Sequence, residues 1–284
     1  MYNGIVFHSL ATLTFIGLTI GLWQALRTGR PVEQLGRYTR AGLLVALAFQ
    51  GIALSQQTLG PGLINLNWAV ALSAAIWLGL IVYWIESLVI RIDGIQLIML
   101  PLAALSCLLA SIFHTTSPII TSADWFMRGH LLLAFSAYGL ITIAAVQALL
   151  MAATDYHLHH PISRSDHPNK FIRTIDRVLD AQPPLLTQER LLFRLIWVAF
   201  GVLTLTVLSG TVITYELTGQ LLTADHKTVF TLLSWITFAI LLAGRIARGW
   251  RGRIALRYTL VGFVFVLLAY SGSQFVVDVI LHKV

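Results

Sequence analysis

The sequence predicts an all-α membrane protein, a bundle of eight transmembrane helices. Apolar residues make up 57% of the 284 residues and charged residues only 11%, whereas a soluble domain carries about a quarter charged residues. The charges lie between long apolar runs, and a helical run of about twenty apolar residues spans a hydrocarbon core of about 30 Å. The composition therefore excludes a soluble domain and predicts a single transmembrane domain over residues 1–284.

Eight apolar runs are long enough to form spans, and turn or charged residues separate them. Gly29-Arg30-Pro31 follows the first run, Gly60-Pro61-Gly62 follows the second, and only Glu86, Arg91 and Asp93 separate the third from the fourth. Pro183-Pro184 precedes the sixth run, and Asp225 precedes the seventh as a predicted N-cap residue. The first run lacks a preceding basic residue and a cleavage site, so we expect a retained helix. The predicted spans are 4–26, 40–57, 68–90, 94–113, 127–151, 190–217, 227–247 and 254–281.

The distribution of Lys and Arg predicts the orientation. Sixteen of the nineteen lie after spans one, three, five and seven, and only Arg128, Lys227 and Lys283 lie on the other side. Basic loops face the cytoplasm, so both termini are expected to be extracytoplasmic. The same distribution explains the net charge of +7 without a nucleic-acid partner.

The longest predicted connection, about 152–189, is expected on the cytoplasmic side. Its histidine-rich stretch Tyr156–His160 is interpreted as a solvated loop, with a metal site as the weaker alternative. Residues 169–180 place apolar side chains along one helical face, which predicts an amphipathic helix on the anionic inner leaflet.

Five of the nine histidines fall at the outer ends of predicted spans, where they lie at a similar depth. Imidazole is a common axial ligand of haem iron and a general ligand of transition metals. The alternative is that interfacial histidines are tolerated because their polar tips reach water. These five are His8, His114, His130, His226 and His282.

His130 is the strongest candidate, because it stands about one turn inside the fifth span. An ionisable side chain within a span is a functional candidate by default. Ala134, Ala137 and Tyr138 follow on much the same face, and small residues let a planar group or a neighbouring helix approach closely. The alternative is ordinary helix packing with an interhelical hydrogen bond.

Two further polar groups occur at the outer side. Asp278 lies one turn before His282, and a carboxylate there can fix the tautomer of an imidazole ligand. A solvated helix end is the equal alternative. Lys227 stands on the side that otherwise lacks basic residues, and it can pair with a carboxylate or a propionate.

Several segments of residues 120–284 resemble the cytochrome c assembly family of CcmC/CcsA-type haem-handling membrane proteins. The segments are His130–Tyr138, Asp225-His226-Lys227 with Trp235 after it, and Gly249-Trp250-Arg251-Gly252-Arg253 with the apolar span that follows. The size, the eight spans and the basic loop before the sixth span are most similar to the YpjD- or HemX-like inner-membrane branch.

The resemblance implies a non-enzymatic protein of the bacterial inner membrane that binds haem at the outer face. His130 and His282 would be axial ligands of the haem iron, with His226 as the alternative to His282. Asp278 would support the second ligand, Lys227 would contact a propionate, and Trp125 is placed with the same cofactor site. The expected partners are the lipid bilayer and cytochrome c assembly proteins or another membrane protein.

Two competing functions remain open. Residues 211–224 contain no tryptophan, and Ala243-Gly244-Arg245 stands where the family has a histidine within the membrane. Both departures favour a structural or regulatory subunit with a decayed haem site. A small-solute transporter is less consistent with the sequence, because mid-span charges are lacking and only Pro101 interrupts a span.

Overall fold

The part of the chain that the structure describes consists of helices and a few turn residues, without a strand. The computed structural model describes residues 2–28, 32–58, 68–88, 93–113, 125–159, 179, 182–221, 223 and 225–269. Each predicted span overlaps one helix, so the all-α fold class is confirmed. The helices are α1 (Tyr2–Thr28), α2 (Val32–Thr58), α3 (Trp68–Ser87), α4 (Asp93–Ile112), α5 (Trp125–His159), α7 (Leu185–Thr218), α8 (His226–Arg248) and α9 (Arg253–Leu267).

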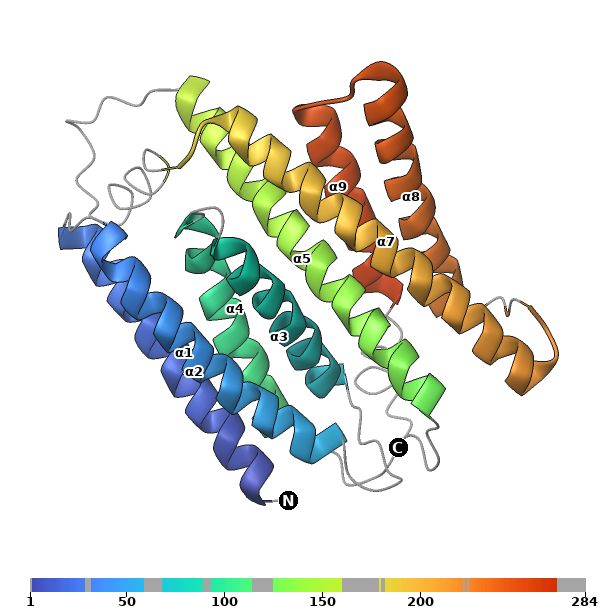
Figure 1. The fold of residues 1–284 in the computed structure, drawn as a ribbon, viewed down its shortest axis with the longest axis horizontal. Coiled ribbons are helices and arrows are strands. Elements are labelled where there is room, and N and C mark those ends of the chain that lie inside the picture. Colours follow the sequence, from blue (N-terminus) through green and yellow to red (C-terminus); the bar gives the residue numbers. More distant parts are fainter. Residues whose placement is uncertain are drawn as a thin grey trace.

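Helix α5 lies at the centre of the bundle. It packs against α3 and α4 on one side and against α7 and α9 on the other. Figure 1 shows it running between the group α1–α4 and the group α7–α9. In its most apolar segment 67% of the residues are buried, more than in any other long apolar helix of the described chain. A residue on α5 therefore faces protein more often than lipid.

Within the described ranges, five helices are long and apolar enough to cross a membrane. They cover Gly4–Ala25, Ile95–Ile112, Trp125–His159, Leu185–Thr218 and His226–Arg248. The apolar part of α3, Ala69–Ile85, is shorter. Residues 270–281 of the predicted eighth span lie outside the described residues. The structure thus supports a multi-pass membrane protein, while the eight spans and the orientation of the termini stay predictions.

The predicted long connection is shorter in the structure. Helix α5 continues to His159 and α7 begins at Leu185, so residues 152–159 are helical and the expectation of a loop there was wrong. Tyr156, Leu158 and His159 are exposed as expected, and His160 lies outside the described residues. Hydropathy marks only the part of a helix inside the hydrocarbon, whereas backbone hydrogen bonding continues into water. An i,i+4 contact of 3.3 Å between Asp155 Oδ1 and His159 Nδ1 supports this last turn. Of the predicted amphipathic helix 169–180, all but Leu179 lies outside the described residues.

Two glycines allow α3 and α5 to approach closely. A Cβ atom added at Gly79 would lie 2.9 Å from the carbonyl oxygen of Gly139, and one added at Gly139 would overlap the carbonyl oxygen of Ala75. Helices in lipid gain stability from such close backbone packing, because the membrane provides no hydrophobic drive for their association. This contact positions α5 against the first half of the bundle.

A tight turn joins α8 to α9. Gly249 ends α8 in the left-handed conformation with φ 64°, which a glycine adopts without strain. The Trp250 ring then lies against Gly244, where a Cβ atom would overlap it. The turn places the first residues of α9 beside α5, with which α9 packs.

Candidate functional site: a pocket around His130

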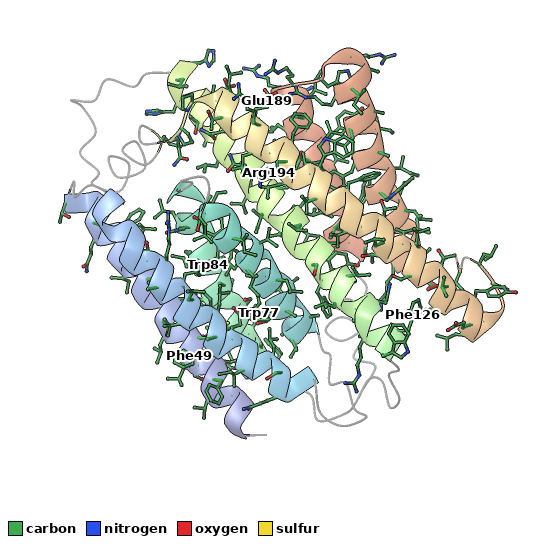
Figure 2. All side chains as sticks on the ribbon, viewed as in Figure 1. Phe49, Trp77, Trp84, Phe126, Glu189 and Arg194 are labelled. Carbon is green, nitrogen blue, oxygen red and sulfur yellow. The ribbon has the colours of Figure 1, made fainter. Side chains whose placement is uncertain are left out.

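A pocket of about 320 Å³ opens between the start of α5, the end of α7 and the start of α8. Figure 2 shows Phe126, at the start of α5, at the end of the bundle opposite Glu189. Apolar side chains such as Leu131 and Phe135 form part of the wall. The pocket therefore lies where the three helices meet at one end of the membrane protein.

Threonines contribute much of the remaining wall, and several have their hydroxyl groups already engaged. On α7, the hydroxyls of Thr206, Thr211 and Thr214 donate to backbone carbonyls four residues earlier, at 2.9 Å in each case. A hydroxyl has only one hydrogen to donate, so these side chains offer a ligand no further proton. Chemistry in the pocket must therefore come mainly from its other polar side chains.

The imidazole of His130 is held by α7. Its Nδ1 atom lies 2.8 Å from Ser209 Oγ. Ser209 Oγ also lies 2.8 Å from the carbonyl oxygen of Leu205, to which its hydroxyl donates. Because the single hydroxyl hydrogen is used there, Oγ is left to accept a hydrogen bond from Nδ1–H of the imidazole. This arrangement favours the tautomer in which Nε2 carries a free lone pair.

Gly210 makes room for this ring. A Cβ atom at Gly210 would lie 3.1 Å from His130 Cε1, closer than ordinary van der Waals contact. Ser209 and Gly210 therefore act on the same imidazole, one through a hydrogen bond and the other through the absence of a side chain. Ser209 was not identified from the sequence, although a serine-glycine pair inside the predicted sixth span is a local signal of close packing.

Asp225 and Lys227 reach the rim of the pocket from the start of α8. Asp225 occupies the N-cap position, but its side chain makes no capping hydrogen bond to the backbone. Its Oδ2 atom instead accepts a hydrogen bond from Thr223 Oγ1 at 3.1 Å. The predicted position of Asp225 is thus right and its predicted side-chain capping is wrong, because a nearer hydroxyl occupies the carboxylate. Lys227 is exposed, so its ammonium group is accessible to a ligand.

The other predicted site residues are placed differently. His226 is exposed and does not line the pocket, although both of its neighbours do. Trp125 is 83% exposed and contacts Phe126 edge-on, with ring centroids 5.9 Å apart. His282 and Asp278 lie outside the described residues.

The remaining outer histidines do not join His130 in the described chain. His8 is buried on α1, away from this pocket, and His114 lies outside the described residues. Within the described ranges, no group of three or more His, Cys, Asp and Glu side chains is arranged to hold a metal ion. From the predicted ligand set, the structure brings together His130 and Lys227.

The interhelical hydrogen bond that was the alternative interpretation of His130 is present. It occupies Nδ1 only, so it does not exclude ligand binding at Nε2. The predicted small-residue face is divided, because Ala134 and Tyr138 line the pocket while Ala137 is buried in the core. The imidazole is therefore both a packing residue and a potential ligand.

Comparison with known proteins identifies the family. The family model described as "Cytochrome C assembly protein" matches residues 39–281.

The chain belongs to the cytochrome c assembly family.

The matched region of the chain includes α3 to α9 and the whole His130 pocket. An uncharacterized 28.8 kDa protein of Azospirillum brasilense is 32% identical over 152 residues, which are 54% of this chain and 52% of that protein. The inner membrane protein YpjD of Escherichia coli K12 is 30% identical over 154 residues, 54% of this chain and 53% of the relative. The cytochrome c biogenesis protein CcsA of Mesostigma viride is 26% identical over 200 residues, 64% of this chain and 65% of the relative. The chain thus matches between about half and two thirds of the length of these relatives.

Proposed function

We propose that this chain is a multi-pass protein of the bacterial inner membrane that binds haem at the outer face during cytochrome c assembly, without enzymatic activity. The observation that carries the proposal is the state of His130. Its Nδ1 atom is occupied by Ser209, which favours the tautomer with a lone pair on Nε2, and the residue lines a pocket. A second hydrogen bond that fixes the tautomer and the ring orientation is the usual support of a metal-ligating histidine.

The residues of the pocket fit one end of a haem. His130 supplies an axial ligand, apolar and methyl-bearing side chains suit a porphyrin face, and Lys227 at the rim suits a propionate. The volume of about 320 Å³ is near the lower limit for small-molecule sites. It is smaller than a porphyrin, so part of the macrocycle would lie outside this pocket.

The remaining predicted residues keep their roles in the proposal. His282 is the proposed second axial ligand and Asp278 its supporting carboxylate, whereas His226 is the alternative second ligand. The exposed ring of Trp125 is proposed to cover an outer edge of the cofactor. The relatives named for cytochrome c biogenesis support partners within that assembly machinery.

The first test is the visible spectrum of detergent-purified protein after haem-supplemented expression. We expect a Soret band that is lost in His130→Ala and altered in His282→Ala. His157→Ala is the matched control, since it is a histidine at the opposite end of α5 that does not line the pocket. A colourless wild-type protein of normal thermal stability, even after haem is added, would refute haem binding.

The proposed topology has a separate test. Alkaline phosphatase is active only outside the cytoplasm, so a fusion after Val284 is expected to be active and a fusion at position 165 inactive. The reverse pattern would place the His130 pocket at the cytoplasmic face and would contradict the outer location.

The second candidate function is a structural or regulatory subunit. The packing at the end of α8 away from the His130 pocket favours it. In the segment where the family resemblance implies a histidine, Gly244 is covered by Trp250, and Arg245 donates to Glu189 Oε1 at 3.0 Å. Packing and an ion pair fill this region in place of a ligand. This function predicts that His130→Ala leaves cytochrome c assembly in cells unchanged, whereas the haem-binding function predicts its loss.

A further inference from the structure

A second and larger pocket, of about 640 Å³, lies at the opposite end of the bundle. It is enclosed by the last turns of α5 and the first turns of α7 and α9. Figure 2 shows Glu189, one of its lining residues, at the end of the bundle away from Phe126. The predicted topology places this end at the cytoplasmic surface of the membrane. The pocket shares no residue with the His130 site.

The wall of this pocket has two chemically different parts. Met151, Leu185 and Leu256 provide an apolar surface, whereas Arg253 and Arg257 provide cationic groups. Both arginines are exposed, so their guanidinium groups reach water at the membrane surface. A ligand that fits must therefore have an apolar portion and an anionic portion at the depth of the headgroups.

The charges around the pocket do not cancel. The buried carboxylate of Glu189 is already paired, with Arg245 Nη1 at 3.0 Å and Arg251 Nε at 2.8 Å from Oε1. Asp155 Oδ2 lies 3.7 Å from Arg253 Nη2, which is long for a hydrogen bond. Four arginines, with Arg257 as the fourth, thus accompany two carboxylates and leave two positive charges in excess.

The starts of two helices add to the positive electrostatic potential at the pocket. Helices α7 and α9 both begin at the pocket, and neither has a side-chain capping hydrogen bond at its first turn. The amide groups at a helix start carry a partial positive charge that favours an anion. The starts of α7 and α9 therefore favour the same ligand charge as the arginines, whereas the carboxyl end of α5 at the same pocket opposes it.

We propose that this pocket binds an anionic phospholipid. The phosphate lies at Arg253, whose contact with Asp155 is long, and at Arg257, which makes no ion pair among the described residues. The part of an acyl chain nearest the headgroup lies along Met151 and Leu256. Basic pockets between transmembrane helices on the cytoplasmic side are suited to acidic headgroups. The site is independent of haem, since it lies at the opposite end of α5 from His130.

The test is the amount of lipid that co-purifies with the full chain from nanodiscs of equal phosphatidylglycerol and phosphatidylcholine. We expect native mass spectrometry to show phosphatidylglycerol bound to the wild type. The variant Arg253→Gln/Arg257→Gln should bind it roughly thirtyfold more weakly, following about 1 kcal/mol for each of the two arginines near the surface. Arg248→Gln is the matched control, because this exposed arginine ends α8 without lining the pocket. Equal retention in all three proteins would overturn the proposal.

A second arm distinguishes a lipid from a soluble phosphate. Dispersed phosphatidylglycerol should raise the thermal unfolding midpoint of the wild type, and inorganic phosphate at millimolar concentration should not. An equal rise of the unfolding midpoint with inorganic phosphate would show that the pocket binds a soluble anion, and it would overturn the lipid proposal. His130→Ala should retain lipid, so failure of the haem proposal and failure of this proposal give different results.

Discussion

His130 Nδ1 lies 2.8 Å from Ser209 Oγ, so one hydrogen bond joins the start of α5 to the last third of α7. The bond occupies Nδ1 and favours the tautomer in which Nε2 of the imidazole carries the free lone pair. The properties of the candidate site therefore depend on a residue that does not itself line the pocket. This relationship, and three others in the bundle, can be tested by single substitutions.

Ser209→Ala is expected to weaken haem binding by about tenfold or more, the usual effect of losing a partner that orients a histidine ligand. Ser209→Thr keeps the hydroxyl and should retain most of the affinity. The measurement is a Soret titration of purified protein. Ser136→Ala is the control, because Ser136 also donates to a carbonyl four residues earlier but on an exposed face of α5. Equal affinity in Ser209→Ala and the wild type would show that the hydrogen bond has no role in ligation.

Gly210→Ala is expected to displace the imidazole, because its Cβ atom would lie 3.1 Å from His130 Cε1. The expected result is a shifted Soret maximum and an affinity reduced by about tenfold, comparable to the loss of an orienting partner. Gly201→Ala on the same helix meets no atom within 4 Å. That control should leave the spectrum unchanged and stabilise the protein by up to about 1 kcal/mol through helix propensity. An unshifted spectrum in both variants would contradict the packing role of Gly210.

Gly139→Ala is expected to lower the apparent free energy of unfolding by about 2 kcal/mol, as is typical of overpacking. The added methyl group would overlap the carbonyl oxygen of Ala75 and force α3 away from α5. Thermal unfolding in detergent measures the effect. Gly17→Ala on α1 meets nothing within 4 Å and should be neutral or slightly stabilising. Similar midpoints for the two variants would show that the α3–α5 contact can relax without cost.

Glu189→Gln is expected to destabilise the protein by about 2 kcal/mol, because it removes the carboxylate that Arg245 and Arg251 share. The estimate lies below the usual effect of breaking a buried pair, since the side chain of Arg251 is 54% exposed and water can solvate it. Glu216→Gln, an exposed position near the other end of the same helix, should change the unfolding midpoint little. The ion pair would be shown to be dispensable if both variants unfolded at the wild-type temperature.

The helical class and the approximate positions of the spans could be predicted from the chain alone. Long apolar runs must satisfy their backbone hydrogen bonds internally when they enter a membrane, and a helix does so within one segment. The ends of α5 and α7 were predicted less well. Residues 152–159 are polar enough to resemble a loop, but helical hydrogen bonding continues through them and the contact of Asp155 with His159 supports it.

Part of the candidate site could also be predicted from residue types and their spacing. His130 stood out because an ionisable group one turn inside a span needs a reason to be there, and Lys227 stood out because its side of the membrane is poor in basic residues. His226 lies between two pocket-lining residues, yet it does not line the pocket itself. One step along a helix rotates a side chain by about 100°, and only the packing of the helix shows which neighbour faces the site.

Tertiary structure decided which residues meet. The contact of His130 with Ser209 and Gly210 crosses between two helices some eighty residues apart in sequence. The second pocket likewise forms only because the first turns of α7 and α9 converge on the end of α5. Local sequence encodes hydropathy and helix formation, because both depend on neighbouring residues. The depth and rotation of each helix arise from packing against the others, so they follow only from the folded bundle.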